Sequence, residues 1–334
     1  MKTTIKDVAK EANVSVMTVS RVINKKEYIA PGTKEKVLKA IRKLHYRPNK
    51  VARSLVVRKT NFIGLIVPDI ANPFFGNLAK GAEGLARKRG YSLILGDTEG
   101  KVENEKEYIE GMRGSMCEGI ILVAPRIEDS LILELNDIIP LVLVDRSIAS
   151  DKILQVWIDN AGGASQAVEH LIQLGHRRIG FLTGPQDVLN SFRRQEGYQR
   201  ALEHHRIPFD PELIVIGDFY LETGYENFDT FFKVKPPPTA IFASNDLMAL
   251  GLIQRAKEKG VDIPGDLSIV GFDDIFLASM VDPPLTTVRH PTVEMGIEAI
   301  GRFLDRLDDI ENSPGKKPLD NRLIVRGSTK AIRE

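Results

Sequence analysis

The chain has 334 residues, of which 43% are hydrophobic and 27% charged, a composition ordinary for a globular protein of two or three domains. Its single cysteine, Cys117, excludes an internal disulfide, and it fits a reducing cytosol, where we interpret it as a small core residue. The sequence has no apolar run of about 18 residues and no apolar stretch after Met1. It therefore predicts a cytoplasmic protein that is neither exported nor membrane-spanning.

Three short helices are predicted in the N-terminal part of the chain. Thr4, with Asp7 three residues later, forms a capping box that begins a helix at residues 5–11. A tight turn follows, in which Val14 is the apolar anchor, and Ser15 and Thr33 cap the second and third helices. The residues expected to form the small core of this part are Val8, Ala9, Ala12, Val19, Val22, Ile23, Val37, Leu38, Ile41 and Leu44. Two helices joined by a short turn, with a third in support, are typical of a helix-turn-helix, whose second helix lies in the DNA major groove.

Positive charge is concentrated in this part of the chain. Residues 1–59 hold 16 Lys and Arg against 4 Asp and Glu, which leaves 30 basic and 41 acidic residues for the rest. Concentrated positive charge gives affinity for phosphates. Helix spacing alone would also fit a small three-helix bundle with a solvated basic face. The charge separation favours DNA binding over that alternative.

The N-terminal runs DVAKEANVSVMTVSRVIN (residues 7–24) and LHYRPNKVARSL (residues 44–55) closely resemble the DNA-binding head of the lactose/purine/ribose (LacI-type) repressor family. The resemblance implies that Val16, Met17 and Arg21 face base edges, with the Arg21 guanidinium on a guanine. Thr18 and Ser20, with Asn24 and Tyr28, would mostly contact phosphates. The candidate DNA-binding residues are Thr4, Ser15, Val16, Met17, Thr18, Ser20, Arg21, Asn24, Tyr28, Asn49, Ala52, Arg53 and Leu55.

Residues 49–56, NKVARSLV, resemble the hinge helix of that family. Such a helix is too short to be stable alone in water, so it is expected to fold on the operator. There Ala52 and Leu55 would enter the minor groove, with Leu55 as an apolar wedge. An ordinary linker with one exposed leucine is the alternative. Paired wedges need two chains, so this hypothesis predicts a homodimer on near-palindromic double-stranded DNA. The absence of leucine heptads after Arg326 also favours a dimer.

From residue 61 onward, short apolar strands alternate with helical patterns, which is typical of buried parallel strands. The predicted strands are residues 63–67, 92–97, 119–123, 141–145, 155–159, 178–183, 213–216, 240–244 and 268–272. They are too many for one comfortable sheet, so we expect two lobes. Residues 160–164 begin a helix at the first crossover, and the late strands 285–290 and 322–325 are assigned to the return crossings. Three crossings would form a hinge beside a ligand cleft.

The expected fold is therefore an all-α helix-turn-helix head with a hinge helix, followed by an α/β core of two Rossmann-like lobes with parallel sheets. The predicted domains are a DNA-binding domain at residues 1–47, a hinge helix and linker at 48–59, and an effector-binding and dimerisation domain at 60–334. Within the last domain, the N-lobe covers about 60–159 and 291–321, and the C-lobe about 160–285 and 322–334.

Ligands of α/β sheets bind outside the carboxyl ends of the strands, so the candidate site residues are those that follow each strand. They are Asn72, Phe74, Phe75, Asp145, Arg146, Arg194, Phe219, Asn245, Asp273 and His290. Aromatic rings can pack on the C–H faces of a sugar, while acids, guanidiniums and amides bind its hydroxyls. Two acids, Asp145 and Asp273, balance the two bases Arg146 and Arg194. This balance favours a neutral polyol, since an anionic ligand would need surplus positive charge.

Each of these residues also has a purely structural interpretation, because paired or solvated charges are the default. The two phenylalanines could be lobe core, and Asp145 with Arg146 could be a structural ion pair. Arg194 could bridge to Glu196 on the surface. The remaining alternatives are a helix cap at Asn245 and Asp246, which is the favoured interpretation for Asp246, and a solvated turn at Asp273 and Asp274.

The body as a whole resembles the periplasmic sugar-binding-protein fold that the same repressor family carries. Its site pattern is similar to that of ribose-binding proteins, except that His290 stands where that pattern has glutamine. The resemblance implies an effector that is D-ribose or a closely related pentose or hexose. By this resemblance the chain is a repressor of a sugar-utilisation operon under allosteric control by a small neutral sugar.

Other functions are less consistent with the sequence. No G-x-G-x-x-G follows the first strand, and no Walker A motif, metal-spaced His/Cys cluster or G-x-S-x-G elbow is present, so we expect no enzyme activity, no cofactor and no metal. A periplasmic transport receptor does not fit the basic head. A catabolite-control-type regulator, whose effector is a phosphorylated carrier protein, is the remaining alternative.

Overall fold

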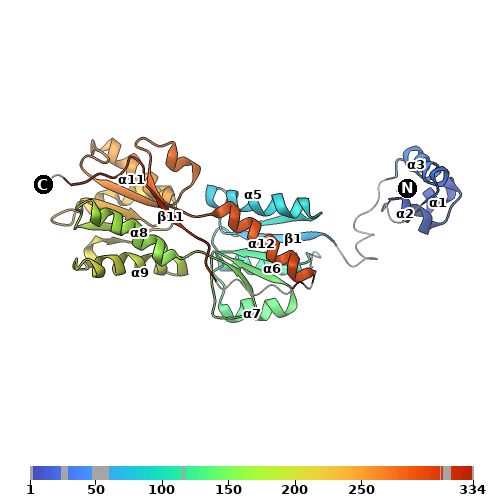
Figure 1. Ribbon diagram of the computed structural model, residues 1–334, viewed down its shortest axis with the longest axis horizontal. Coiled ribbons are helices and arrows are strands. Elements are labelled where there is room, and N and C mark those ends of the chain that lie inside the picture. The colour runs from blue at the N-terminus through green and yellow to red at the C-terminus, as the bar shows by residue number, and fades with distance from the viewer. Residues whose placement is uncertain are drawn as a thin grey trace. The chain divides into compact units, whose positions relative to one another are not determined.

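The computed structural model describes residues 3–23, 29–46, 60–114, 117–308, 310 and 317–332. The chain forms two compact units, Met1–Thr60 and Asn61–Glu334, which we call the head and the core and describe separately (Figure 1). Within the described residues, no helix combines the length and apolar character that crossing a bilayer requires.

The head contains the three predicted helices, α1 (Ile5–Ala12), α2 (Val16–Ile23) and α3 (Pro31–Lys43). The capping box is present, because the Thr4 hydroxyl accepts from the Asp7 N–H at 3.4 Å and the Asp7 carboxylate accepts from the Thr4 N–H at 2.8 Å. Asn13 makes the turn in the left-handed conformation, with φ at 50°. Ser15 caps α2 by accepting from the Thr18 N–H at 3.1 Å. The sequence therefore predicted the two helices of the motif correctly.

Two details of α3 were predicted wrongly. The helix begins at Pro31 rather than after Thr33, because proline already has the backbone angle that the first helical position requires. Leu38 is 40% exposed, while Ala40 is buried. The inward positions follow the helical spacing from Val37 through Ala40 and Ile41, and Leu38 lies off that stripe.

The core contains two sheets, as predicted. The N-lobe sheet has the order β2-β1-β3-β4-β5 with every pair parallel. Its strands are β1 (Phe62–Val67), β2 (Ser92–Asp97), β3 (Ile120–Val123), β4 (Leu141–Val144) and β5 (Leu154–Val156). The helices packed around it are α5 (Pro73–Lys88), α6 (Val102–Gly114), α7 (Asp129–Ile138) and α12 (Thr292–Leu307) (Figure 1).

The C-lobe sheet has the order β11-β10-β9-β8-β6-β7, and only its edge strand β11 is antiparallel. Its strands are β6 (Ile179–Leu182), β7 (Ile214–Val215), β8 (Ala240–Ala243), β9 (Ser268–Asp273), β10 (Thr286–Arg289) and β11 (Arg322–Ile324). Its helices are α8 (Asn160–Gln173), α9 (Leu189–His204), α10 (Leu221–Phe231) and α11 (Asp246–Glu258), with 3-10 turns at Pro211–Leu213 and Phe276–Ser279. All eleven predicted strands are present.

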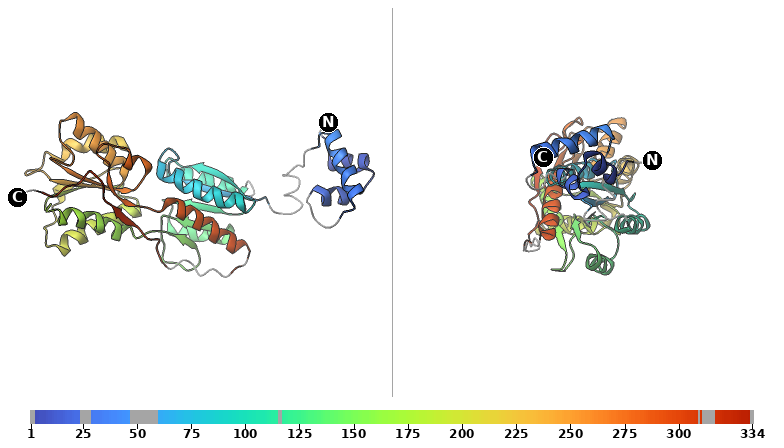
Figure 2. Two further views of the ribbon diagram at one scale, coloured as in Figure 1. Left: turned by 45° about the horizontal axis from the view of Figure 1, so that its top comes forward. Right: turned by 90° about the vertical axis from the view of Figure 1, so that its right-hand side faces the viewer.

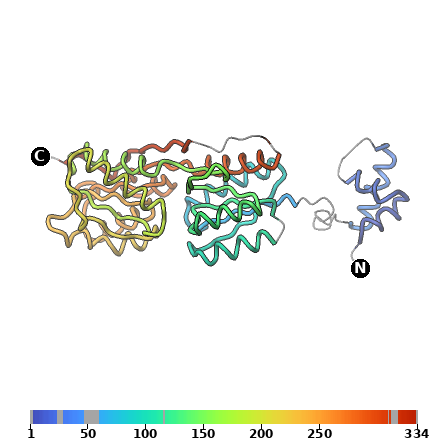
Figure 3. The backbone as a smooth tube through the Cα atoms, turned by 90° about the horizontal axis from the view of Figure 1, so that it is seen from below, coloured from blue at the N-terminus to red at the C-terminus, as the bar shows by residue number. Residues whose placement is uncertain are grey.

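The chain passes between the lobes three times, and Figures 2 and 3 show these segments side by side. The first passage leads from β5 into α8, the second from β10 into α12, and the third returns to β11. The first and third are joined, since the Leu319 N–H donates to the Trp157 carbonyl at 2.8 Å and the Asn321 amide donates to the Asp159 carbonyl at 2.7 Å. Strands β10 and β11 belong to the C-lobe sheet. The second and third crossings therefore lie next to these two strands and not within them.

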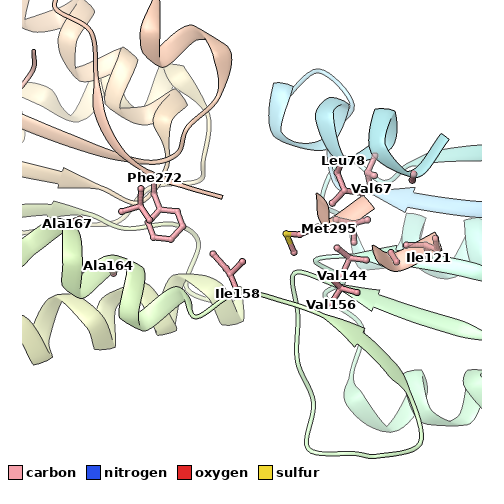
Figure 4. Packing of buried hydrophobic residues seen from close by; sticks show 14 of the residues in the cluster. Val67, Leu78, Ile121, Val144, Val156, Ile158, Ala164, Ala167, Phe272 and Met295 are labelled. Carbon is pink, nitrogen blue, oxygen red and sulfur yellow. The ribbon is translucent and has the colours of Figure 1, made fainter. Parts of the chain in front are cut away.

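The buried apolar core is continuous from one lobe to the other. Val144 and Met295 lie on the N-lobe side, and Ile158 and Phe272 face them from the crossing and the C-lobe (Figure 4). In the N-lobe, α5 and α12 approach so closely that a Cβ on Gly81 would collide with the Val293 carbonyl. This packing fixes the carboxyl ends of both sheets on either side of the crossings.

Candidate functional site

A cavity of about 330 Å³ lies between the lobes, at the carboxyl ends of the strands. Its volume falls within the range of about 300–1,000 Å³ that is usual for small-molecule sites. Eight of the ten candidate residues line it, namely Asn72, Phe74, Phe75, Asp145, Arg194, Phe219, Asn245 and Asp273. Arg146 and His290 are not among the lining residues.

The wall supplied by the N-lobe begins at α5. Asn72 caps this helix by accepting from the Phe74 N–H at 3.0 Å, and Pro73 occupies its first position, as the sequence predicted. The Phe74 and Phe75 rings meet edge to face, with centroids 4.9 Å apart. Phe74 also belongs to a buried apolar cluster with Leu250 and Ile275 of the C-lobe, so it is both core residue and cavity wall.

Asp145 follows β4 with φ at 56° and is buried. Asn190 of the C-lobe donates from its amide both to the Asp145 carbonyl at 2.9 Å and to Oδ2 at 2.8 Å. Asp145 Oδ1 is buried, and no hydrogen-bond donor reaches it within the described part of the chain. Nε2 of His290 lies 3.4 Å from this oxygen, and Asp145 lines the cavity, where its carboxylate could accept from a ligand hydroxyl.

Arg194 provides the cation on the opposite wall and is only 4% exposed. Its Nε donates to Asn160 Oδ1 at 2.8 Å, and one terminal nitrogen donates to the Ser244 carbonyl. The other terminal nitrogen lies 3.8 Å from Asp273 Oδ1, and the guanidinium carbon sits 3.9 Å from the centroid of the Phe272 ring. These contacts hold the guanidinium rigidly, so the surface alternative with Glu196 is wrong. Glu196 pairs instead with Arg193.

Asn245 acts both as helix cap and as cavity wall. Its Oδ1 accepts from the Met248 N–H at 2.9 Å, and its Nδ2 donates to the Phe219 carbonyl at 2.8 Å, which fixes the positive-φ backbone of Phe219. Asp246 is not the cap. It is fully buried and accepts from the Ile275 N–H at 2.9 Å and from the Thr287 hydroxyl. Burial and then the Asp273 carboxylate raise the pKa of Asp246 well above its ordinary value.

Arg146 was predicted to bind the ligand, but the structure turns it away from the cavity. One terminal nitrogen donates to the carbonyls of Pro125 at 2.6 Å and Ile127 at 2.7 Å, and the other pairs with Asp129. The side chain therefore ties down the loop after β3. Arg146 is not among the residues that line this cavity, whereas Asp145 is.

His290 was also predicted to contact the ligand. Its side chain is 0% exposed and lies behind Asp145 and Asp273, at 3.4 Å from Asp145 Oδ1 and 3.6 Å from Asp273 Oδ1. The ring packs edge-on against Phe74, with a centroid distance of 4.7 Å. His290 thus contacts the two acids rather than the cavity.

Several lining residues were missed. Asn190 precedes Arg194 by one helical turn, a spacing that places both on one face of α9 and could have revealed it. Arg126 follows β3, and its N–H donates to the buried Glu105 carboxylate at 2.8 Å, while its side chain reaches Asp187 of the C-lobe at 3.3 Å. The other missed charged and aromatic lining residues are Asp69, Glu99, Asp218 and Tyr220.

With these additions, the cavity is more acidic than the sequence suggested. Five carboxylates line it, against the two guanidiniums of Arg126 and Arg194. An anionic ligand would meet net repulsion there, whereas hydroxyl groups could donate to the acids.

In the head, α2 exposes two large apolar side chains, with Val16 41% and Met17 64% exposed. Arg21 lies on the same exposed surface, while Val19 and Val22 are buried. Thr4 and Ser15 make the caps described above. The candidates Asn24, Tyr28, Asn49, Ala52, Arg53 and Leu55, and with them the hinge helix, lie outside the described residues.

A helix-turn-helix head on a two-lobed core with a cavity between the lobes defines a class of bacterial regulators. Two family models agree with this assignment. The one for bacterial regulatory proteins of the lacI family matches residues 4–49, and the one for a periplasmic binding protein-like domain matches residues 168–329.

Three curated proteins are each 37% identical to this chain. The HTH-type transcriptional repressor CytR of Escherichia coli (strain K12) aligns over 330 residues, which are 98% of this chain and 97% of that protein. Catabolite control protein A of Priestia megaterium aligns over 332 residues, which are 99% of this chain and 100% of that protein. The ribose operon repressor of Halalkalibacterium halodurans aligns over 335 residues, which are 98% of this chain and 97% of that protein. A solved lac repressor dimer bound to operator and the anti-inducer ONPF is similar, with a TM-score of 0.89 and 28% identity over 99% of this chain and 100% of that one. The chain belongs to the lacI family of bacterial regulatory proteins.

Proposed function

We propose that the protein is a sequence-specific transcriptional repressor of a sugar-utilisation operon, and that a small neutral sugar, ribose-like in its hydroxyl pattern, controls it by binding between the lobes. Two chains would pair on a near-palindromic operator, with the hinge at residues 48–59 folding on the DNA. The sugar would favour one lobe arrangement and so release the operator.

The observation that carries this proposal is the composition of the cavity. Asp145 and Asp273 bring two carboxylates to the cavity, Arg194 is held rigidly beside Asp273, and Phe74, Phe75 and Phe219 supply aromatic surface. This is the set of groups that a polyol needs, with apolar faces for its C–H groups and charged acceptors and donors for its hydroxyls.

The comparisons support the family but do not choose the effector, because three relatives with different names share the same identity. One of them is catabolite control protein A, so a phosphorylated carrier protein remains the second candidate effector. The acidic cavity favours a neutral sugar as the small-molecule effector, and a pull-down from cell extract with and without sugar separates the two candidates.

Calorimetry with a panel of free pentoses and hexoses tests the proposal. We expect at least one neutral aldose, D-ribose first, to bind at millimolar concentration or below. Asp273→Asn should abolish that binding and leave DNA affinity largely intact. Asp274→Asn is the matched control, because Asp274 pairs with Arg326 at 2.6 Å and does not line the cavity. If no neutral aldose binds at millimolar concentration, the sugar proposal is wrong.

A further inference from the structure

His290 lies in the second crossing, between β10 and α12, and its position is fixed by contacts on all sides. The backbone N–H of His290 donates to the Asp273 carbonyl at 3.1 Å, which anchors the backbone to the C-lobe. Phe74 of the N-lobe covers one side of the ring, and Phe272 of the C-lobe lies 6.1 Å away on another, measured between centroids. The ring therefore has no room to turn toward solvent.

The two ring nitrogens face acids from different lobes. Nε2 lies 3.4 Å from Oδ1 of Asp145, which follows β4 of the N-lobe. Nδ1 lies 3.6 Å from Oδ1 of Asp273, at the end of β9 in the C-lobe. Neither contact has hydrogen-bond geometry among the described residues, and each becomes an ion pair when the imidazole is protonated. A neutral imidazole carries one N–H and could donate to one acid only, whereas an imidazolium can serve both.

We propose that His290 is a positioning residue, an imidazolium that holds the Asp145 and Asp273 carboxylates of the two lobes in place for the effector, so that lobe closure takes up a proton. The inference rests on the proposed effector site, and it adds that pH regulates the closure of the lobes around that site. His290 does not line the cavity, so it acts through the two acids and not by touching the ligand.

The charges around His290 give the direction of this effect. Burial lowers the pKa of His290, but Asp145 and Asp273 together outweigh burial and raise it above its ordinary value. The other charged groups near the pair are Arg194, 3.8 Å from Asp273, and the buried Asp246, whose pKa the Asp273 carboxylate raises. Burial raises the pKa of Asp273, and His290 and Arg194 oppose that rise.

When the lobes separate, Asp145 moves away from His290 while Asp273 stays beside it, and the pKa of the imidazole falls from its raised value because one of the two acids is lost. Protonation therefore stabilises the closed state. This stabilisation is complete below the pKa of the imidazole in the open state and is lost as pH rises through the raised pKa of the closed state. Between the two values, the closed-to-open ratio should change by up to about tenfold per pH unit.

A distance measurement between the lobes tests the proposal without any ligand. Spin labels are placed on Glu134→Cys of α7 and Gln199→Cys of α9, which are exposed positions in the two lobes of the full-length protein. Burial raises the pKa of the Cys117 thiol, so it competes poorly for the label. We expect the population with the longer label-to-label distance, which is the open state, to rise between pH 6 and pH 9 along a titration curve for the loss of one proton.

Two substitutions decide whether His290 is responsible. In His290→Gln the distances should no longer change with pH, because glutamine keeps the side chain polar but cannot take up a proton. His170→Gln is the matched control. His170 is a partly buried histidine of α8 that contacts Thr329 at 3.0 Å, and its replacement should leave the pH profile unchanged. A wild-type protein without pH dependence, or an unchanged profile in His290→Gln, would overturn the proposal.

Calorimetry with D-ribose at the same pH values separates this proposal from the sugar proposal. If D-ribose binds, its affinity should fall with rising pH in the wild type and in His170→Gln but not in His290→Gln. If it does not bind at any pH, the choice of sugar is wrong, and the distance measurement still decides the role of His290.

Discussion

Replacing Arg194 with methionine should destabilise the core strongly, because the change strips a buried site of its cation. The guanidinium is 4% exposed and donates to Asn160 and to the Ser244 carbonyl, and it lies 3.8 Å from Asp273. Breaking a buried ion pair by removing one partner costs about 3–5 kcal/mol. Methionine keeps an apolar chain over Phe272, and His290 still faces Asp273, so we expect the lower end of that range.

Urea unfolding followed by fluorescence measures this loss, because the chain has a single tryptophan, Trp157, which lies in the first crossing. Arg193→Met is the matched control. Arg193 is the preceding residue on the same helix, with its side chain 54% exposed and paired to Glu196, so its loss should change stability by less than about 0.5 kcal/mol.

A double substitution, Arg194→Met with Asp273→Asn, should recover part of the stability, because it removes the stranded carboxylate as well as the cation. If Arg194→Met costs less than about 1 kcal/mol, or no more than Arg193→Met, the assignment of Arg194 to a buried charge network is wrong.

Three further predictions concern packing, capping and DNA. Gly81→Ala should lower the thermal midpoint, because its Cβ would force α5 away from the Val293 carbonyl. Gly84→Ala on the same helix is the control, since a Cβ there meets nothing within 4 Å, and it should raise stability by up to about 1 kcal/mol. Equal effects of the two substitutions would contradict the close approach of α5 and α12. Thr4→Ala should cost the head about 0.5–2 kcal/mol, seen as faster hydrogen exchange in α1, and unchanged exchange would exclude the cap. Leu55→Ala should weaken binding to operator more than to random DNA, and an equal loss on both would remove the wedge hypothesis.

The strand pattern was predictable because most of the core strands are buried on both faces. Runs such as residues 63–67 and 141–144 are apolar at nearly every position, and this signal does not depend on distant contacts. The caps were predictable for a similar reason, since Thr4, Ser15 and Asn72 act within two or three residues of themselves. Local rules were sufficient in these cases.

The direction of individual site side chains was not predictable in the same way. Arg146 follows a strand, as Asp145 does, but its guanidinium binds the loop after β3. His290 has the right position in the chain, yet the rings of Phe74 and Phe272 keep it behind the two acids. These placements depend on packing between the lobes, which residue spacing does not report.

The most direct test of the account is a DNA-binding titration by fluorescence anisotropy, with and without a panel of neutral pentoses and hexoses. The DNA is a fragment that the protein itself selects from a random pool. The account predicts tight, salt-dependent binding to that fragment and release when one of the sugars is added, with D-ribose the first candidate. A protein that selects no fragment, or one whose DNA affinity no sugar changes, would contradict it.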